Sequence, residues 1–143
     1  MNEETPSTTA GAEPLAAAAR QVRRAQKLVG MQTRIPYPMH SWLKSYAALA
    51  GMTLTDLHED LFAHFLSDKP WQQPGWVWRQ PQSVVQRIGG MDSRVGEWTQ
   101  HNIQLGETYS DIIKVEAEKA GVSLATFLFS GIFWAVLTLY RPK

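Results

Sequence analysis

The chain has 143 residues, of which 44% are apolar and 19% are charged, and it contains six tryptophans. This length predicts about one domain, and this apolar content is enough to build a core. Because there is no cysteine, the sequence excludes a disulfide framework, a thiol nucleophile and a thiolate zinc site.

The formal net charge is only +1, but the charges are unevenly distributed along the chain. Residues 15–46 contain no acid, whereas residues 47–68 contain four acids and no lysine or arginine. The basic side chains of the first stretch are Arg20, Arg23, Arg24, Lys27, Arg34 and Lys44. The sequence therefore predicts a local basic field in the N-terminal third.

Two segments precede the first expected element. Residues 1–14 carry acidic residues and no apolar run, so we interpret them as a disordered tail and not as an export signal. Together with the lack of cysteine, this favours a cytoplasmic location. Residues 15–29 are rich in Ala, Arg, Gln and Lys but have a thin apolar stripe, which predicts a basic arm that is helical only when supported.

Residues 30–66 predict a strand followed by two helices. Residues 30–35 precede Pro36 and Pro38, which forbid a helix across them and favour extended backbone. Apolar residues then recur at spacings of three and four as far as Gly51, which is typical of the position just past a helix end. Thr53 is placed as the N-cap of a second helix, whose buried side would carry Leu54, Leu57, Leu61, Phe62, Phe65 and Leu66.

The same arrangement recurs seventy residues later, over residues 98–143. Apolar and polar residues alternate from His101 to Leu105, a helical pattern runs to Ala120, Gly121 is the expected C-cap, and Ser123 is the expected N-cap. A lone strand-helix-helix unit of this size would leave its strand unpaired and its apolar faces uncovered. We therefore expect the two units to pair within one chain as a monomer, with higher oligomers left open.

Residues 67–97 form the expected connector between the units. This segment contains three prolines, the Gly89-Gly90 pair, and Trp71, Trp76 and Trp78. Because loops of this length are uncommon in compact domains, we expect the tryptophans to pin it to the surface and residues 83–88 to form a short helix. A tryptophan platform that stacks on bases is the alternative.

The strand that ends in Ile-Pro, the Gly-x-Thr/Ser corners and the apolar second helices together resemble the ribbon-helix-helix family, the MetJ and Arc superfamily of DNA-binding proteins. In that family, two strands pair into an antiparallel ribbon that enters the DNA major groove. The resemblance covers about residues 30–66 and 98–140. It extends to the tandem, single-chain TraY and VirC-type members of conjugative plasmids. It implies a mainly α fold with a two-stranded antiparallel β-ribbon, arranged as a tandem ribbon-helix-helix pseudo-dimer.

Alternation along the strands predicts which side chains face DNA. If Thr33, Ile35, Ile103 and Leu105 point to the core, the outer face carries amide and guanidinium groups, which can read adenine and guanine. The expected base contacts are Gln32, Arg34, Gln100, Asn102 and Gln104. The alternative is that these are solvent-facing polar residues of an edge ribbon. Arg34 lies opposite a glutamine of the other copy, so we expect an imperfectly symmetric DNA site.

The resemblance also implies phosphate contacts at the start of each second helix, where free backbone N–H groups form anion sites. These contacts fall on Thr53, Leu54, Ser123 and Leu124. Arg20, Arg23, Arg24 and Lys27 would add salt-sensitive phosphate contacts. The alternative for the helix starts is simple N-capping, and the alternative for the basic residues is a solvated helix face. Several acids suggest that the second copy serves folding more than binding, namely Glu107, Asp111, Glu116 and Glu118.

Other classes of function have less support in the sequence. The spacing of the four histidines fits no zincin motif, and neither a nucleophile elbow nor a phosphate loop is present, so we expect no enzyme, no metal and no cofactor. Residues 124–140 form an uncharged run at the short limit for a membrane span. We interpret it as a buried helix and expect no membrane. A protein-interaction or membrane-associated adaptor that uses this helix is the alternative.

The expected role is sequence-specific binding of double-stranded DNA. By analogy with the tandem members, it would be an accessory role at a plasmid transfer origin, with a relaxase or another component of the nucleoprotein complex as partner. A transcriptional repressor that binds an operator is the alternative.

Overall fold

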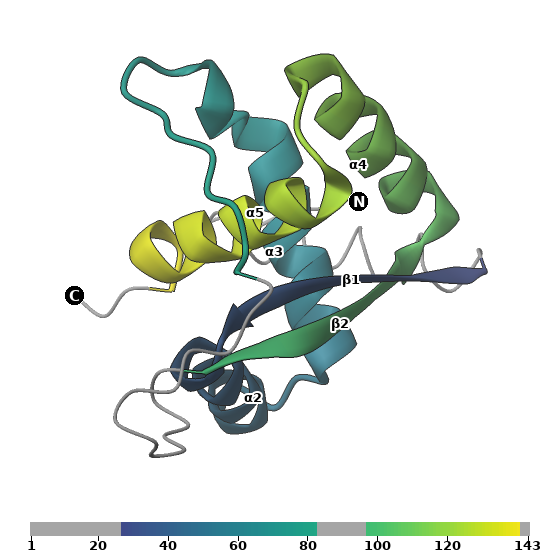
Figure 1. Ribbon diagram of the computed structural model, residues 1–143. Helices are drawn as coiled ribbons and strands as arrows, with labels where there is room; N and C mark the ends of the chain where they lie inside the picture. Colours follow the sequence, from purple (N-terminus) through teal and green to yellow (C-terminus); the bar gives the residue numbers. More distant parts are fainter. Residues whose placement is uncertain (1–26, 83–96, 141–143) are drawn as a thin grey trace, which may run out of the picture.

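A computed structural model describes residues 27–82 and 97–140 of the chain (Figure 1). These residues form a mainly α fold with one two-stranded antiparallel sheet, as the sequence predicted. In chain order the elements are β1 (Leu28–Pro36), α2 (Tyr37–Leu49), α3 (Leu54–Asp68), the 3-10 helix η1 (Pro70–Gln72), β2 (Trp98–Gly106), α4 (Glu107–Ala120) and α5 (Leu124–Thr138).

The bounds of these elements recur at an offset of seventy residues. Both ends of β1 recur in β2, and both ends of α3 recur in α5. The first strand is longer than the expected run of residues 30–35, because Leu28 and Val29 pair with Gly106 and Leu105 of β2. The boundary between the N-terminal arm and the first strand therefore lies at residue 28, which corrects the boundary placed at residue 30.

The two strands pair over their whole length, with Gln32 opposite Asn102 at the centre of the register. Along each strand, buried and exposed side chains alternate over the central residues. The predicted inward residues Thr33, Ile35, Ile103 and Leu105 are buried. The other buried strand side chains are Met31 and His101.

The expected helix boundaries are confirmed where local chemistry specifies them. Thr53 forms a reciprocal capping box with Asp56 at the start of α3, and Ser123 accepts a hydrogen bond from the Thr126 N–H at the start of α5. Gly51 and Gly121 have φ values of 71° and 73°, in the left-handed region that favours glycine at helix ends.

The second helices, α3 and α5, form the centre of the core. Gly131 of α5 lies so close to α3 that an added Cβ would be 2.8 Å from Cε1 of Phe62. In Figure 1, α3 passes behind the two strands, while α2 and α4 lie at opposite ends of the ribbon. Helix α3 is buried on every side from Leu57 to Phe65, charged residues included, whereas the sequence pattern predicted burial of one face. This is because β2, α2, α4 and α5 all pack against it.

The described part of the connector packs on the second helices, as the packing interpretation predicted. Trp71 lies 4.9 Å from Phe65 and 5.3 Å from Phe127 between ring centroids, and Trp78 lies 5.6 Å from Phe127. The connector then runs across α5 toward the ribbon (Figure 1). It is fixed there by the Arg79 N–H, which donates to the Ser130 hydroxyl over 2.9 Å. The short helix expected over residues 83–88 lies outside the described residues.

Candidate nucleic-acid interface

The outer face of the ribbon carries the side chains that the sequence assigned to base contacts. Gln32, Gln100, Asn102 and Gln104 are exposed, and Arg34 is half-buried. No acidic residue occurs in either strand. Since a nine-residue strand spans roughly 30 Å and paired strands are about 4.8 Å apart, the ribbon has dimensions that fit a major groove about 12 Å wide.

Two interactions organise the side chains of this face. The Gln100 amide donates to Oδ1 of Asn102 over 2.9 Å, so these two of the three amides of β2 are oriented toward each other. Arg34 pairs with Gln100 in the register, and its Nη2 donates to the Trp98 carbonyl over 3.0 Å. Its Nε–H is buried and has no hydrogen-bond acceptor among the described residues. Within the described residues, the guanidinium therefore makes only some of the hydrogen bonds that it can donate.

The face is hollowed on both sides of its central pair. One hollow of about 360 Å³ lies between Gln32, Arg34 and Gln100 of the ribbon and Ala125 in the first turn of α5. Pro81 and Gln82 at the end of the described connector also line it. A second hollow of about 320 Å³ lies over Gln32, Asn102 and Gln104. The amide and guanidinium side chains of the ribbon and one helix start thus share a concave surface.

The starts of the two second helices differ electrostatically. At α3, the carboxylate of Asp56 lies within the capping box and adds negative charge beside the free backbone N–H groups. At α5, the first turn contains no acid, and Ser123 supplies an uncharged cap. The Thr33 hydroxyl donates to the Ala125 carbonyl over 2.7 Å, which ties this helix start to the ribbon. Of the two predicted phosphate sites, the one at Ser123 and Leu124 is therefore the more favourable for an anion.

Of the four basic residues predicted to contact phosphates, Lys27 falls within the described residues. Arg20, Arg23 and Arg24 fall outside the described residues. Lys27 is exposed, and its carbonyl accepts a hydrogen bond from the Glu107 N–H beside the end of β2. On α4, Glu107, Asp111 and Glu118 are exposed, and Glu116 lies 3.7 Å from the Lys119 ammonium.

The structure brings together three histidines that sequence spacing did not connect. Nδ1 of His40 in α2 lies 2.9 Å from Nδ1 of His101 in β2, and Nε2 of His101 lies 2.7 Å from Nε2 of His58 in α3. The ligand-spacing tests applied to the sequence require neighbours on one helix, so they did not find this group. The available signal was a histidine at an inward position of the second strand.

These nitrogens do not converge on one point, because His101 uses opposite sides of its ring for the two hydrogen bonds. Among residues 27–82 and 97–140, no group of histidine, cysteine or carboxylate side chains has the geometry of a metal site. The expectation that no metal is bound remains a prediction.

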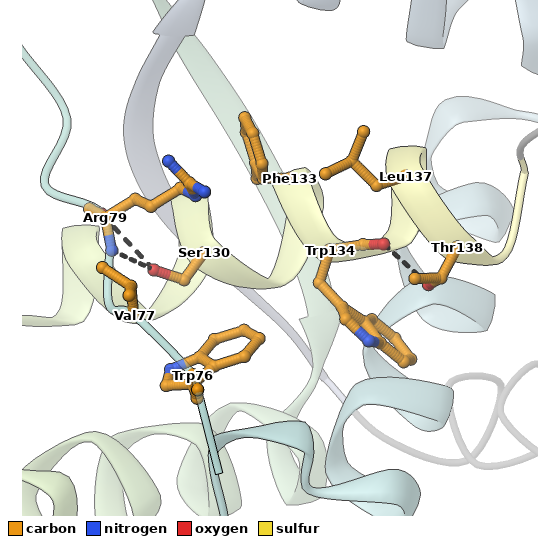
Figure 2. A pocket seen from close by; sticks show the side chains of 9 residues that line it. Trp76, Val77, Arg79, Ser130, Phe133, Trp134, Leu137 and Thr138 are labelled. Atoms are coloured by element: carbon orange, nitrogen blue, oxygen red, sulfur yellow. Dashed lines mark hydrogen bonds between the residues drawn. The ribbon is translucent and has the colours of Figure 1, made fainter. Parts of the chain in front are cut away.

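A separate hollow of about 170 Å³ lies between the connector and α5 (Figure 2). Its wall includes the rings of Trp76, Phe133 and Trp134. The guanidinium of Arg79 lies 4.0 Å from the centroid of the Phe133 ring, which is a cation–π contact. At its rim, Val77 and Leu137 are 63% and 50% exposed, so apolar surface remains uncovered on the C-terminal helix.

No family model, curated protein or solved structure matches the chain. The assignment of a function therefore rests on the geometry of the site. In the parts of the chain that the structure describes, no single helix is long and apolar enough to cross a membrane. Helices α4 and α5 reach that length only as a pair, and they meet at a bend of 102°.

Proposed function

We propose that this protein binds double-stranded DNA sequence-specifically, by inserting its β1–β2 ribbon into the major groove. The proposal includes a tandem arrangement in which β1, α2 and α3 form one ribbon-helix-helix unit and β2, α4 and α5 form the other. The resemblance of the sequence to that family supports it.

The register of the ribbon is the observation that carries the proposal. Gln32 and Asn102 are seventy residues apart, so they are equivalent positions of the two units, and they pair with each other. A local two-fold axis through this pair relates β1 to β2. An antiparallel ribbon of this kind presents both strands to one groove with opposite chain directions, which matches the symmetry of duplex DNA.

The chemistry of the outer face supports base reading. Four exposed amides and one guanidinium lie within a few residues of the axis. Asn and Gln pair bidentately with adenine and Arg with guanine, and each good pair discriminates by about 1–3 kcal/mol. Backbone N–H groups at the start of α5, beside the ribbon, would receive a phosphate of the flanking backbone.

Selection from a random duplex pool tests this function, followed by affinity measurements on the recovered sequence. Gln32→Ala with Asn102→Ala should lower affinity for that sequence at least tenfold and affinity for random DNA little. Gln72→Ala is the matched control, because this glutamine is exposed on η1, away from the ribbon. If no sequence is enriched, or if the ribbon variant binds as the wild type does, the proposal is wrong.

For the biological role, we propose an accessory factor at a plasmid transfer origin in the cytoplasm, with a relaxase as partner. This step rests on the resemblance to tandem family members alone. A repressor is the alternative, and the position of the selected sequence in its natural DNA distinguishes the two. A site beside a nicking site favours the accessory role, and a site overlapping a promoter favours repression.

Protein binding at the hollow beside α5 is a second candidate function. The exposed Val77 and Leu137 and the cationic Arg79, with no carboxylate in the lining, favour an acidic peptide that inserts one aliphatic side chain. Peptides selected from a displayed library should combine leucine with acidic residues, and Leu137→Asp should abolish their binding. Selection of basic or polar peptides would contradict this candidate.

A further inference from the structure

A continuous chain of three imidazoles crosses the interior behind the ribbon. We name His40, His101 and His58 the imidazole chain. His101 and His58 are 0% and 1% exposed, while His40 is only half-buried and forms the end nearest to solvent. Neighbouring rings meet edge to face, with interplanar angles of 90° and 87°. This geometry aligns the ring nitrogens of successive residues for hydrogen bonding.

Both hydrogen bonds of the chain join the two halves of the molecule. His40 and His58 belong to α2 and α3, whereas His101 belongs to β2, which follows the connector. On β2, His101 lies between Gln100 and Asn102, with its side chain inward where theirs are exposed. The imidazole chain therefore holds the strand that carries three of the four proposed base-reading amides.

The two hydrogen bonds limit how many protons the imidazole chain can bind. A neutral imidazole has one donor and one acceptor nitrogen, so three neutral rings satisfy both hydrogen bonds with all donors pointing in one direction. One added proton can be held at an end of the chain. A second added proton leaves two N–H groups facing each other, and it breaks one of the two bonds.

The equivalent positions in the other half of the molecule are filled by side chains other than histidine. The positions seventy residues from His40, His101 and His58 are occupied by Ser110, Met31 and Leu128, all of them buried. Ser110 lies 3.8 Å from the Met31 sulfur, which repeats the contact between His40 and His101 across the axis. The fold therefore does not require imidazoles at these positions, and their presence calls for another explanation.

We propose that the imidazole chain positions β2 for DNA and makes the attachment of that strand sensitive to acid, so that the folded, DNA-binding form loses stability as the pH falls below about 6. The proposal rests on the proposed DNA-binding function. It assigns to His101 the role of a positioning residue, since its side chain faces away from the DNA.

The charged surroundings favour the neutral form of the chain. Lys44 of α2 is the cation that acts on His40 and His101, and it lowers the pKa of both after the larger effect of burial. The carboxylates adjacent to His58 face other partners. Burial, and after it the charge of Glu59, raises the pKa of Tyr109 on α4, and Asp60 accepts a hydrogen bond from Tyr140 and lies beside His64. Tyr37 of α2 packs on the outer ring, His40.

Burial lowers the pKa of His58 to about 3 and that of His101 to about 4, from an ordinary value of 6.5. The unfolded chain therefore binds more protons than the folded chain below pH 6.5. The stabilisation is complete above that pH and is lost progressively as the pH falls toward the folded values. Two such histidines raise the unfolding equilibrium constant roughly 500-fold between pH 7 and pH 5.

The test compares the wild type with a variant that copies the other half, His40→Ser with His101→Met and His58→Leu. Urea unfolding without DNA should show the steep loss of stability between pH 7 and pH 5 in the wild type and a much flatter profile in the variant. At pH 5, in urea at a concentration that leaves the wild type folded at pH 7, the variant should retain binding to the selected duplex while the wild type has lost most of it. His64→Gln is the control histidine, because His64 contacts Asp60 and lies outside the chain.

Three results separate the outcomes. Equal pH profiles for the wild type and the triple variant, in unfolding or in DNA binding, overturn the proposed role of the imidazole chain. A steep unfolding profile without DNA binding at any pH overturns the proposed function, because the chain then acts on stability alone. If the triple variant does not fold, the imidazole C2 proton resonances of the wild type decide: titration of His58 and His101 near pH 6.5 in the folded protein overturns the proposal, and titration below pH 5 supports it.

Discussion

At the scale of single residues, Arg34 shows how the fold and the proposed function share one side chain. One guanidinium nitrogen donates to the Trp98 carbonyl, while Nε–H is buried without an acceptor in the described chain. A buried donor that lacks a partner costs about 1–3 kcal/mol. Contact with a guanine would supply an acceptor to Nε–H only if the side chain turned outward, and part of this cost would then be recovered on binding.

Arg34→Ala is therefore expected to weaken binding to the selected sequence by roughly 5- to 150-fold, because one bidentate base contact is lost. Affinity for random DNA should fall much less, and urea stability should change little. Fluorescence anisotropy on both duplexes measures the difference. An equal loss on the two duplexes would show that Arg34 contributes general charge and not base reading.

At the scale of elements, the two helix starts are alike in backbone geometry and different in charge. Both α3 and α5 begin after a hydroxyl cap, but only α3 has a carboxylate in its first turn, at Asp56. A negative charge stabilises the helix start by interaction with the dipole, and it opposes a phosphate at the same place. The chain therefore stabilises α3 at the expense of anion binding there.

Asp56→Asn should keep a side-chain acceptor for the Thr53 N–H and remove this opposing charge. We expect affinity for DNA to rise a few-fold at low salt, with a steeper dependence on salt concentration because the phosphate contact is strengthened. The helix itself should lose a few tenths of a kcal/mol to about 1 kcal/mol of stability. Unchanged affinity and salt dependence would indicate that the start of α3 does not meet the DNA backbone.

The crossing of α3 and α5 depends on the absence of a side chain at Gly131. A methyl group there would meet the Phe62 ring at 2.8 Å and the Phe65 ring at 3.0 Å. Alanine favours a helix by about 1 kcal/mol over glycine, but the overlap forces the helices apart. We expect Gly131→Ala to destabilise the protein by about 1–2 kcal/mol net, measured by urea unfolding. A more stable variant would show that the phenylalanine rings can move aside.

At the scale of the whole molecule, both strands of the ribbon belong to one chain. Folding then requires no second molecule, and the effective concentration of one half for the other is set by the connector. The melting temperature should therefore be the same at 1 µM and 100 µM protein, because only associating systems show a concentration dependence. A melting temperature that rises with concentration would indicate that the folded unit contains more than one chain.

The sequence predicts those features of the fold that are specified locally. Alternation identifies the inward residues of both strands, and Thr53, Ser123 and Gly121 mark helix ends through hydrogen bonds and backbone angles that involve only near neighbours. The pairing of strands follows from the repeat, which is a property of the whole chain. The assignment of DNA contacts to the outer face stays a prediction.

Features that depend on contacts between distant elements were not predicted. His40, His58 and His101 meet because three elements pack together, and no spacing along the chain encodes that meeting. The burial of α3 on every side was missed for the same reason, since the helices that cover it come from both halves of the chain. The longer β1 was missed because its first two residues acquire strand geometry from their partners on β2.

The pairing of Gln32 with Asn102 has a genetic consequence. In a ribbon made by two identical chains, one codon change alters both strands together, so both halves of a recognised sequence must change at once. Here each strand is encoded separately, and a mutation in one leaves the other intact. If the ribbon binds DNA as proposed, preference for one half of the target can change by single mutations while the second half keeps the complex bound.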